Sequence, residues 1–466
     1  MSLTRMFFAA GLLAAAPLQA QSGLFVTTTD FSTGSTAFWG GGDAGAETNL
    51  LTIHSDAVGH YHDGRIYVIN RLGQDNILVL DPADLGNPLT QFSVGNGANP
   101  HDIEVVAPDK AYVTPYGTAE LLVVDPRDGS QLSRIDLSAF ADGDGLPEVS
   151  QIVRVGDRIY LSCQRLDRDN GWGPAGVSYL AVVDIASDAL VDVDPDTEGV
   201  QGIALSVPNP NSVVAVGERI AVGVVSGFGD RAGGVDLIDP AANASLGLAV
   251  SEADLGGDIN FLAMVNNVEG YAVVSDENFV NLVLPFNLET GAVGAPLENL
   301  SGGFIPSIAV DGGRLLVADR GSFSAPEDAG VKVFDAATGA LLQGPIDTGL
   351  PPSSLVVLSD APVPTAVEEG PSQPQSSALE PAYPNPFNAS VQIPFVLHQA
   401  AAAEIAVFDM LGRQVRTLAA GHLAAGRHLV RWDGRDGRGQ TVGNGAYFVR
   451  LNQGGLAETS KVLLLK

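Results

Sequence analysis

Carboxylates at short spacing are the side chains of this chain best suited to hold a metal ion. Asp142 and Asp144 stand two residues apart in an Asp-Gly-Asp-Gly turn, and Glu148 follows four residues later. A tight turn gathers such oxygens on one side, and hard oxygen ligands suit Ca²⁺. The segment predicts a calcium site, with a solvated acidic turn as the alternative. The alternating acids of residues 192–198 are a weaker form of the same pattern.

Histidines form a second candidate metal site. His60 and His62 alternate along one predicted strand and therefore share a face, and His101 stands near the start of the next strand of this kind. Imidazoles that meet in this way can bind zinc or another transition metal. The alternative is that each His satisfies a turn or a contact within its own repeat.

A long segment between two predicted strands combines Arg and Trp side chains, which can hold a carboxylate or the face of a sugar. Long loops in compact folds often carry function. Shorter segments with Arg recur at the same place in later repeats, so we expect them to rim one mouth of a channel. The alternative for the long segment is an internal Arg165–Asp167 pair that braces the loop. The candidate ligand-binding residues are Arg165, Asp167, Arg168, Trp172, Asp230, Arg231 and Arg320.

The elements that must position these residues are short strands that recur along residues 21–360. Seven apolar runs of four residues follow one another at spacings of 42, 45, 48, 61, 51 and 44 residues. A period of this length with short strands is typical of propeller blades, each a four-stranded antiparallel sheet. A β-solenoid is the alternative, but its repeats are shorter and more regular. The central residues of the runs are Phe25, Tyr67, Tyr112, Tyr160, Ala221, Ala272 and Leu316.

The ends of the repeat region predict a closed ring. Each unit has a lead strand before its apolar run, and a seventh lead strand at Ser353–Leu358 has no run after it. Its partner is the first run, Leu24–Thr28, at the other end. Pairing of the two would remove free sheet edges. We therefore predict an all-β chain with a seven-bladed β-propeller.

A second domain follows a linker. Residues 361–378 are rich in Pro and Ser without an apolar period, which is typical of an extended linker. Residues 379–466 then carry alternating apolar runs separated by Gly, Asp and Asn, which predicts a small Ig-like β-sandwich. The runs are Val391–Phe395, Ile405–Phe408, His428–Trp432, Ala446–Leu451 and Lys461–Leu465.

The N-terminus and the cysteine content indicate export. Residues 1–20 combine Arg5, an apolar run and small residues before Ala20, as a secretory signal peptide does. No later run is apolar enough to cross a bilayer. Cys163 is the only cysteine, so no internal disulfide forms, and its place in a strand predicts a small buried apolar side chain.

Charge is divided unevenly along the chain, whose formal net charge is −30. Residues 380–466 hold 9 basic and 6 acidic side chains, whereas residues 21–379 hold 14 basic and 48 acidic ones, a net charge of −34. A body this acidic repels nucleic acid and anionic lipid. It suits solubility, cation binding, or both.

Two resemblances follow from these motifs. Residues 379–466, with Tyr383-Pro-Asn-Pro-Phe-Asn388, the Leu-Gly-Arg turn and the Trp-Asp-Gly-Arg-Asp turn, resemble the C-terminal sorting domain of type IX secretion and the Ig-like module of flagellar hook-cap proteins. Ala389 departs from the Pro often found there. The repeats Ile66–Asn70 with Val79–Pro82, and Tyr112–Thr114 with Val123–Gly129, resemble YncE-like seven-bladed propellers.

The resemblances imply an extracellular or outer-membrane surface protein. The tail would engage outer-membrane sorting machinery, and the propeller, a monomer, would bind a protein or glycan ligand. The alternative is a secreted propeller enzyme, such as a lyase, lactonase or oxidoreductase, with a metal-assisted site at the channel mouth. No Ser/His/Asp spacing, nucleotide loop or haem motif supports that alternative, and Ca²⁺ is the only cofactor that we expect.

Overall fold

The computed structural model of the chain divides into two compact units, Met1–Pro364 and Thr365–Lys466. It describes residues 23–322 and 325–359, and in the second unit 378–379, 382, 385, 387–388, 390–397, 400–410, 412–423, 426–453 and 456–465. The predicted signal peptide (1–20) and residues 361–377 of the predicted linker lie outside the described residues. No helix in the described part is long and apolar enough to cross a membrane.

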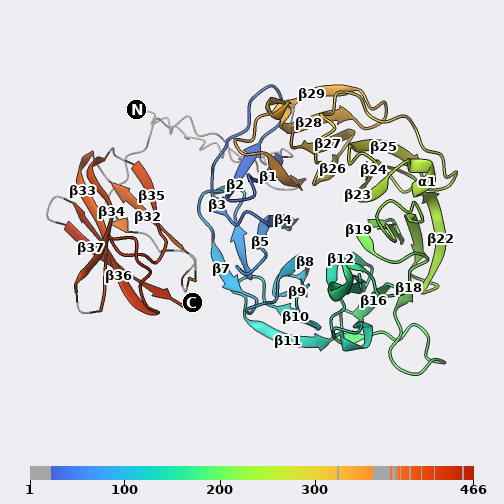
Figure 1. Cartoon of the computed structure of the whole chain (residues 1–466), viewed down its shortest axis with the longest axis horizontal. Helices are drawn as coiled ribbons and strands as arrows, with labels where there is room; N and C mark the ends of the chain where they lie inside the picture. Colours follow the sequence, from blue (N-terminus) through green and yellow to red (C-terminus); the bar gives the residue numbers. More distant parts are fainter. Residues whose placement is uncertain are drawn as a thin grey trace, which may run out of the picture. The chain divides into compact units, whose positions relative to one another are not determined.

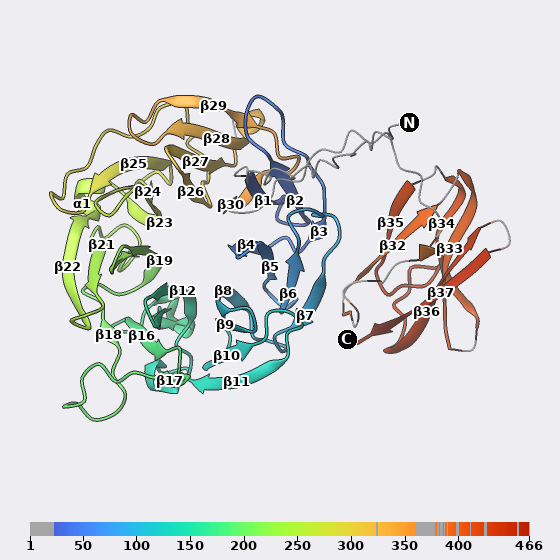
Figure 2. The same ribbon diagram turned by 180° about the vertical axis from the view of Figure 1, so that it is seen from behind.

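The first unit is a ring of seven antiparallel sheets, as the repeat predicted (Figures 1 and 2). In each sheet the first strand named lies nearest the channel. The sheets are β30 (Pro352–Leu358), β1 (Gly23–Thr29), β2 (Gly34–Trp39), β3 (Thr52–Ile53); β4 (Ala57–His62), β5 (Arg65–Asn70), β6 (Asn76–Leu80), β7 (Thr90–Ser93); β8 (Pro100–Ala107), β9 (Lys110–Pro115), β10 (Glu120–Val124), β11 (Gln131–Asp136); β12 (Val149–Val155), β13 (Arg158–Cys163), β16 (Tyr179–Asp184), β17 (Ala189–Leu190); β19 (Pro210–Val216), β20 (Arg219–Val224), β21 (Gly234–Asp239), β22 (Ala244–Ser251); β23 (Asp258–Met264), β24 (Glu269–Ser275), β25 (Asn281–Asn287); and β26 (Ile308–Asp311), β27 (Arg314–Asp319), β28 (Gly330–Asp335), β29 (Leu341–Ile346).

Two sheets depart from the four-stranded pattern. The β23–β25 sheet has three strands, extended only by a single bridge between Phe286 and Val293. The β12 sheet gains β18 (Ile203–Ala204), and its long loop forms the hairpin of β14 (Leu166–Asp167) and β15 (Gly173–Pro174). The short helical segments are α1 (Glu252–Leu255), η1 (Ser138–Phe140), η2 (Arg168–Asn170) and η3 (Pro326–Asp328).

The ring closes as the ends of the chain predicted. β30, the last strand of the propeller, pairs with β1, the first, from Gly23 opposite Leu358 to Thr28 opposite Pro352. Their side chains join the core next to β27 and β28, where Leu24 and Val26 are buried with Leu316. The first and last sheet strands of the propeller therefore share one blade.

The propeller has no single core but an apolar layer between each pair of neighbouring sheets. Large side chains such as Phe25, Tyr112, Tyr160 and Phe334 fill these layers and are fully buried. Cys163 is buried among them, as predicted, and burial raises the pKa of its thiol to about 12. A thiol in this state is inert at neutral pH.

A belt of side-chain hydrogen bonds joins the innermost strands of neighbouring sheets. At five junctions a side chain of one inner strand, or of the residue before it, accepts a backbone N–H of the next inner strand along the ring. Inner strands face the channel and lack a sheet partner on that side, so these acceptors satisfy N–H groups that would otherwise need water. In each of these five pairs the first residue supplies the accepting side chain and the second supplies the backbone N–H. The pairs are Asp102 with Ile152 (3.2 Å), Gln151 with Val213 (2.6 Å), Ser212 with Leu262 (3.1 Å), Ser307 with Leu355 (3.2 Å) and Ser354 with Gly59 (3.3 Å).

The two faces of the ring carry different connections. Every inner strand begins at the same face, and every second strand ends there, so this face holds the turns from second to third strand and the connections between blades. We call it the mouth face. The far face holds the turns from first to second and from third to fourth strand.

The second unit is a β-sandwich of two antiparallel sheets, β31 (Ala378–Leu379), β32 (Val391–Leu397), β35 (Gly426–Trp432) and β34 (Gln414–Leu423), β33 (Ala401–Phe408), β36 (Gly445–Gln453), β37 (Leu456–Leu464). Its core is built on Trp432, Phe395 and Phe387, with the Trp432 Nε1 donating to the Arg435 carbonyl (2.8 Å). The five predicted strands are present. The sequence did not predict β34, whose mixed polar and apolar side chains are all half-buried or exposed and show no clear alternation.

Candidate functional site at the mouth of the channel

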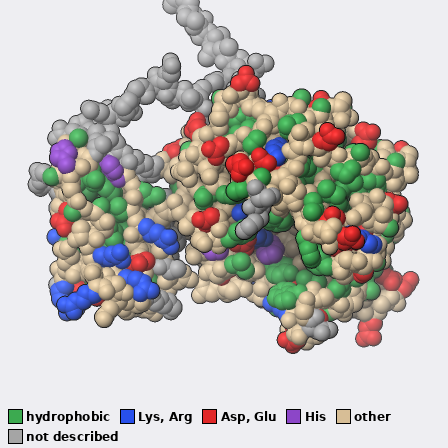
Figure 3. All heavy atoms as spheres, turned by 45° about the horizontal axis from the view of Figure 1, so that its top comes forward, with side chains coloured by type: hydrophobic (Ala, Val, Ile, Leu, Met, Phe, Trp, Pro, Cys, Tyr) green, Lys and Arg blue, Asp and Glu red, His purple; other side chains and the backbone are tan. Residues whose placement is uncertain are grey.

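A cavity of about 630 Å³ opens at the mouth face, where the inner strands begin. Its wall is formed by the first residues of inner strands, among them His101 and Asp102, and by residues that follow second strands, such as Arg71 and Arg320. Figure 3 shows a hollow at the centre of the propeller, bordered by hydrophobic side chains, with a His side chain visible inside it. The mouth is thus a candidate binding site of the size that small ligands occupy.

Much of the polar wall of this cavity is already engaged within the fold. Asp102, Gln151, Ser307 and Ser354 belong to the belt that joins the inner strands. The Gln164 side-chain amide donates to the Pro210 carbonyl (2.9 Å). Few of these groups are left to bind a ligand, so the polarity of the wall is chiefly structural.

Burial favours the neutral forms of Asp102 and of the two histidines near it. Burial in the channel wall raises the pKa of Asp102 to about 7, against the opposing effect of the N–H groups of Ile152 and Ile103. His60, whose Nδ1 lies 3.8 Å from the Asp102 Oδ1, has its pKa lowered by burial to about 4. The ring of His101 stacks on Tyr116 with centroids 4.2 Å apart, and burial lowers its pKa to about 3.

We expect Asp102→Asn to make the propeller more stable at pH 8 but not at pH 4. The folded-state pKa of about 7 exceeds the ordinary value of 3.8. The stability that Asp102 contributes is therefore complete below pH 4 and is lost as the pH rises to 7. About a quarter of this side chain faces channel water, so screening leaves an expected gain of about 1–3 kcal/mol. Urea unfolding at both pH values measures it, and a gain independent of pH would contradict the prediction.

Arg320, one of the predicted ligand-binding residues, lies in the cavity wall. Its guanidinium donates to the carbonyls of Thr29 (2.8 Å) and Pro352 (3.2 Å), and lies 4.3 Å from the ring centre of Phe31. These contacts tie the loop after β27 to the blade that closes the ring.

The long loop after β13 lies on the mouth face, and only its first residue, Gln164, is part of the cavity wall. Arg165 donates to the carbonyls of Val177 and Ala141 and lies over the ring of Tyr179. These contacts brace the loop through backbone carbonyls. The carboxylate of Asp167 accepts the N–H of Asp169 within the same loop.

Arg168 is the centre of this loop. Its Nε lies 2.8 Å from the Glu148 Oε1 and 3.5 Å from the Asp144 Oδ2, and its guanidinium lies 5.2 Å from the ring centre of Trp172. Glu148, fully buried, also accepts the N–H of Leu166 (3.1 Å). The arginine thus occupies the position between the two carboxylates that the predicted calcium ion would need.

Neither predicted metal site is assembled as a ligand set. Across residues 23–359 and the described part of the sandwich, no three His, Cys, Asp or Glu side chains are grouped to hold a metal ion. Among Asp142, Asp144 and Glu148, the Arg168 guanidinium pairs with the carboxylates of Asp144 and Glu148. Among His60, His62 and His101, the ring of His101 stacks on Tyr116, while His60 lies near Asp102. Binding of Ca²⁺ or a transition metal remains an untested prediction.

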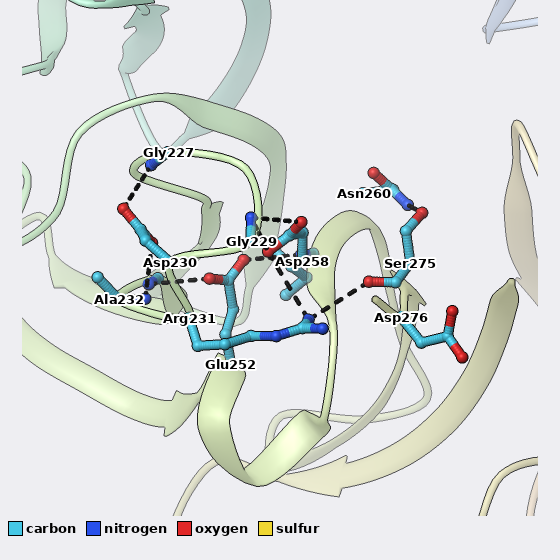
Figure 4. Close-up of polar contacts among 12 residues, drawn as sticks. Gly227, Gly229, Asp230, Arg231, Ala232, Glu252, Asp258, Asn260, Ser275 and Asp276 are labelled. Carbon is cyan, nitrogen blue, oxygen red and sulfur yellow. Dashed lines mark hydrogen bonds and ion pairs between the residues drawn. The ribbon is translucent and has the colours of Figure 1, made fainter. Parts of the chain in front are cut away.

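The loop after β20 carries Asp230 and Arg231 and is fixed by two buried carboxylates (Figure 4). Asp258 accepts the N–H of Gly229 (2.9 Å) and lies 3.7 Å from the Arg231 Nη1. Glu252 accepts the N–H groups of Gly233 and Ile259, and burial raises its pKa to about 7. Arg231 therefore braces its loop toward the β23–β24 strands, and Asp230 stays at the surface turn.

The sequence reading missed several residues of the cavity wall. Arg71 pairs with Asp56 (2.6 Å), and Gln151, Gln164 and Asn211 line the cavity beside it. A signal was present in the sequence, because five of the seven inner strands (β8, β12, β19, β23 and β30) carry a polar residue among their first three positions.

Comparison with known proteins supports this architecture. Residues 388–455 match the FlgD Ig-like domain. The hydrazine synthase of Kuenenia stuttgartiensis shares 15% identity over 66% of this chain and 92% of its own, with a TM-score of 0.50. No curated protein matches the sequence.

Two further structures are similar at lower scores. A putative 6-phosphogluconolactonase from Bacteroides fragilis is 15% identical over 74% of this chain and all of its own (100%), with a TM-score of 0.48. PorZ, a surface component of the type IX secretion system of Porphyromonas gingivalis, is 12% identical over 96% of this chain and 74% of its own, with a TM-score of 0.27. Identities this low concern the fold alone. The chain is a β-propeller protein with a C-terminal FlgD Ig-like domain.

Proposed function

We propose that the chain is an exported binding protein of the cell surface, whose propeller takes a ligand at the mouth face. The observation that carries this proposal is the open cavity of about 630 Å³ at that face, in which the belt and other internal hydrogen bonds engage much of the polar wall. Acid–base or nucleophilic machinery would need unengaged groups at hydrogen-bond distance from a substrate position. A binding surface needs only shape and exposed contact area.

We further propose that residues 379–466 act as a sorting domain for type IX secretion, and that the propeller is of the YncE-like kind. Support for sorting comes from the motifs of the tail together with its FlgD Ig-like match. Support for the propeller kind comes from the repeats around Tyr67 and Tyr112. The partner of the tail would then be outer-membrane sorting machinery.

Removal of residues 379–466 is expected to keep the protein in the periplasm of its native host. The propeller core lies wholly within residues 23–358, so the shortened chain should still fold. Fractionation followed by protease treatment of intact cells measures its location. The complementary fusion protein, in which residues 361–466 follow a signal peptide and a periplasmic reporter, should reach the surface. Unchanged surface delivery of the shortened chain would refute the sorting proposal without touching the binding proposal.

A further inference from the structure

Six exposed Phe, Leu and Trp side chains stand on the mouth face, in addition to Val177. Four follow second strands in the turns to third strands, one lies in the long loop after β13, and one lies in the connection before β26. Among the described propeller residues, every exposed Phe or Trp is on this face, whereas the other exposed leucines lie on outer strands or the far face. The six, here called the apolar rim, are Phe31, Leu72, Trp172, Phe228, Phe279 and Phe304.

The side chains of the rim are more exposed, and more confined to one face, than is usual for single apolar residues on a protein surface. Phe279 is 82% exposed, and Phe31 and Phe228 are each 72% exposed. Single exposed apolar residues are common on protein surfaces, but a group of them on one face marks an interaction site.

Backbone conformation adds an independent observation. Phe31, Leu72, Trp172 and Phe279 have φ of 68°, 48°, 62° and 59°, which is the left-handed region. Large side chains are strained there by about 1 kcal/mol or more, whereas glycine is not. The fold would be served better by glycine at these positions. Strain of this kind is found where a side chain is kept for function.

Carboxylates stand beside the rim and remain ionised. Asp30 accepts the N–H groups of Ser32 and Thr33, and Asp276 accepts those of Asn278 and Val280. Backbone hydrogen bonds hold the pKa of Asp30, and likewise of Asp276, below its ordinary value; that of Asp230 is also lowered, against a burial effect that raises it. Each of the three lies within three residues of a rim Phe.

The arginines of this face offset those carboxylates only in part. Arg71 pairs with Asp56, Arg168 with Glu148 and Arg231 with Asp258. Arg320, over the ring of Phe31, acts on Asp30, and Arg231 acts on Asp276. The rim thus presents apolar rings next to carboxylates, on a body whose net charge of −34 is strongly negative.

From these observations we propose that the mouth face docks a polypeptide segment carrying basic and apolar side chains. Its aliphatic side chains contact the rim, while Lys or Arg side chains reach the carboxylates and the faces of the rings. A glycan fits less well, because Phe offers no hydrogen bond and much of the polar wall is engaged within the fold. An anionic lipid surface is repelled by the acidic body. The inference rests on the proposed binding function and names its class of partner.

Trp172 provides a reporter at the site. It is 52% exposed, whereas Trp39 and Trp432, the other two tryptophans, are 3% and 0% exposed. A peptide that docks on the rim should shift the emission of Trp172 to shorter wavelength without affecting the buried pair. The probes are a 12-residue peptide of alternating Lys and Leu, its Lys–Ser and Glu–Leu counterparts, a mixture of neutral oligosaccharides, and phosphatidylcholine vesicles, each titrated into the full chain at moderate salt.

We expect the Lys–Leu peptide to shift the emission, and its Kd to rise at least tenfold in the double variant Phe31→Gly, Phe279→Gly. Relief of the left-handed strain should leave the unfolding midpoint of this variant at or above that of the natural protein. The matched control is Leu246→Ser, a 58% exposed apolar residue on the outer strand β22, which should leave Kd unchanged.

Failure of the inference and failure of the proposed function give different results. Equal affinity of the glycine variant, equal binding of the Lys–Ser peptide, or a preference for oligosaccharide or vesicle would overturn the named partner while a binding function remains. If no probe shifts Trp172, both fall. A glycine variant that is clearly less stable would assign the rim a structural role and also overturn the inference.

Discussion

A chain that stops after residue 350 is expected to aggregate, whereas one that stops after residue 359 should fold as a closed propeller. The nine additional residues contain β30, which pairs with β1 over six residue pairs and buries Leu355, Val356 and Leu358. Burial of about three aliphatic side chains stabilises a fold by roughly 5–9 kcal/mol, comparable with the whole stability of a domain. Its loss also leaves β1 as an open edge.

Size-exclusion chromatography and urea unfolding of the two chains test this expectation. The chain ending at 359 is the matched control, because it lacks the sandwich in the same way. A synthetic peptide of residues 351–359 added during refolding should rescue the shorter chain by restoring the strand. A monomeric shorter chain with an unchanged unfolding midpoint would show that closure by β30 contributes little.

The second large effect is expected at a buried ion pair below the mouth face. The Lys332 Nζ lies 2.9 Å from the Asp319 Oδ2, and the two side chains are 5% and 0% exposed. Asp319 also accepts the N–H groups of Ser301 and Gly321. Lys332→Met removes the cation but leaves the carboxylate, so the free energy of unfolding should fall by about 3–5 kcal/mol.

The double variant Lys332→Met, Asp319→Asn should recover part of that loss, because no uncompensated charge remains. The control is Arg134→Met, which breaks the exposed pair with Glu120 and should change stability by less than about 1 kcal/mol. Urea unfolding measures all three. If the double variant loses as much as Lys332→Met, the charge is not the cause.

The sequence predicted the fold well for a physical reason. Each blade needs one fully apolar strand between two neighbouring apolar layers, and that strand recurs as a visible run around residues such as Tyr67 and Tyr160. The pairing of β1 with β30 could be predicted because the sequence contains one lead strand, at Ser353–Leu358, with no apolar run after it. The β34 strand was missed because its side chains are not sorted between core and water.

The candidate site was harder to predict, because its residues meet across blades. The spacing of Asp142, Asp144 and Glu148 could not predict the position of Arg168. The β14–β15 hairpin places this arginine beside the carboxylates of Asp144 and Glu148. The belt joins residues about fifty positions apart, as Asp102 and Ile152 are. The rim could not be predicted from the sequence either. A loop residue such as Phe279 is recognised as left-handed only when its φ is known.

The closing strand also determines how the propeller bears load. β30 enters its blade at the mouth face and ends at Leu358 on the far face, from which the chain continues toward the sandwich. If the sandwich is held and a docked partner pulls on the mouth face, tension runs along β30, parallel to its strand axis. All of its hydrogen bonds with β1 are then sheared together rather than opened one after another. The same strand that completes the ring is therefore placed to resist mechanical extraction.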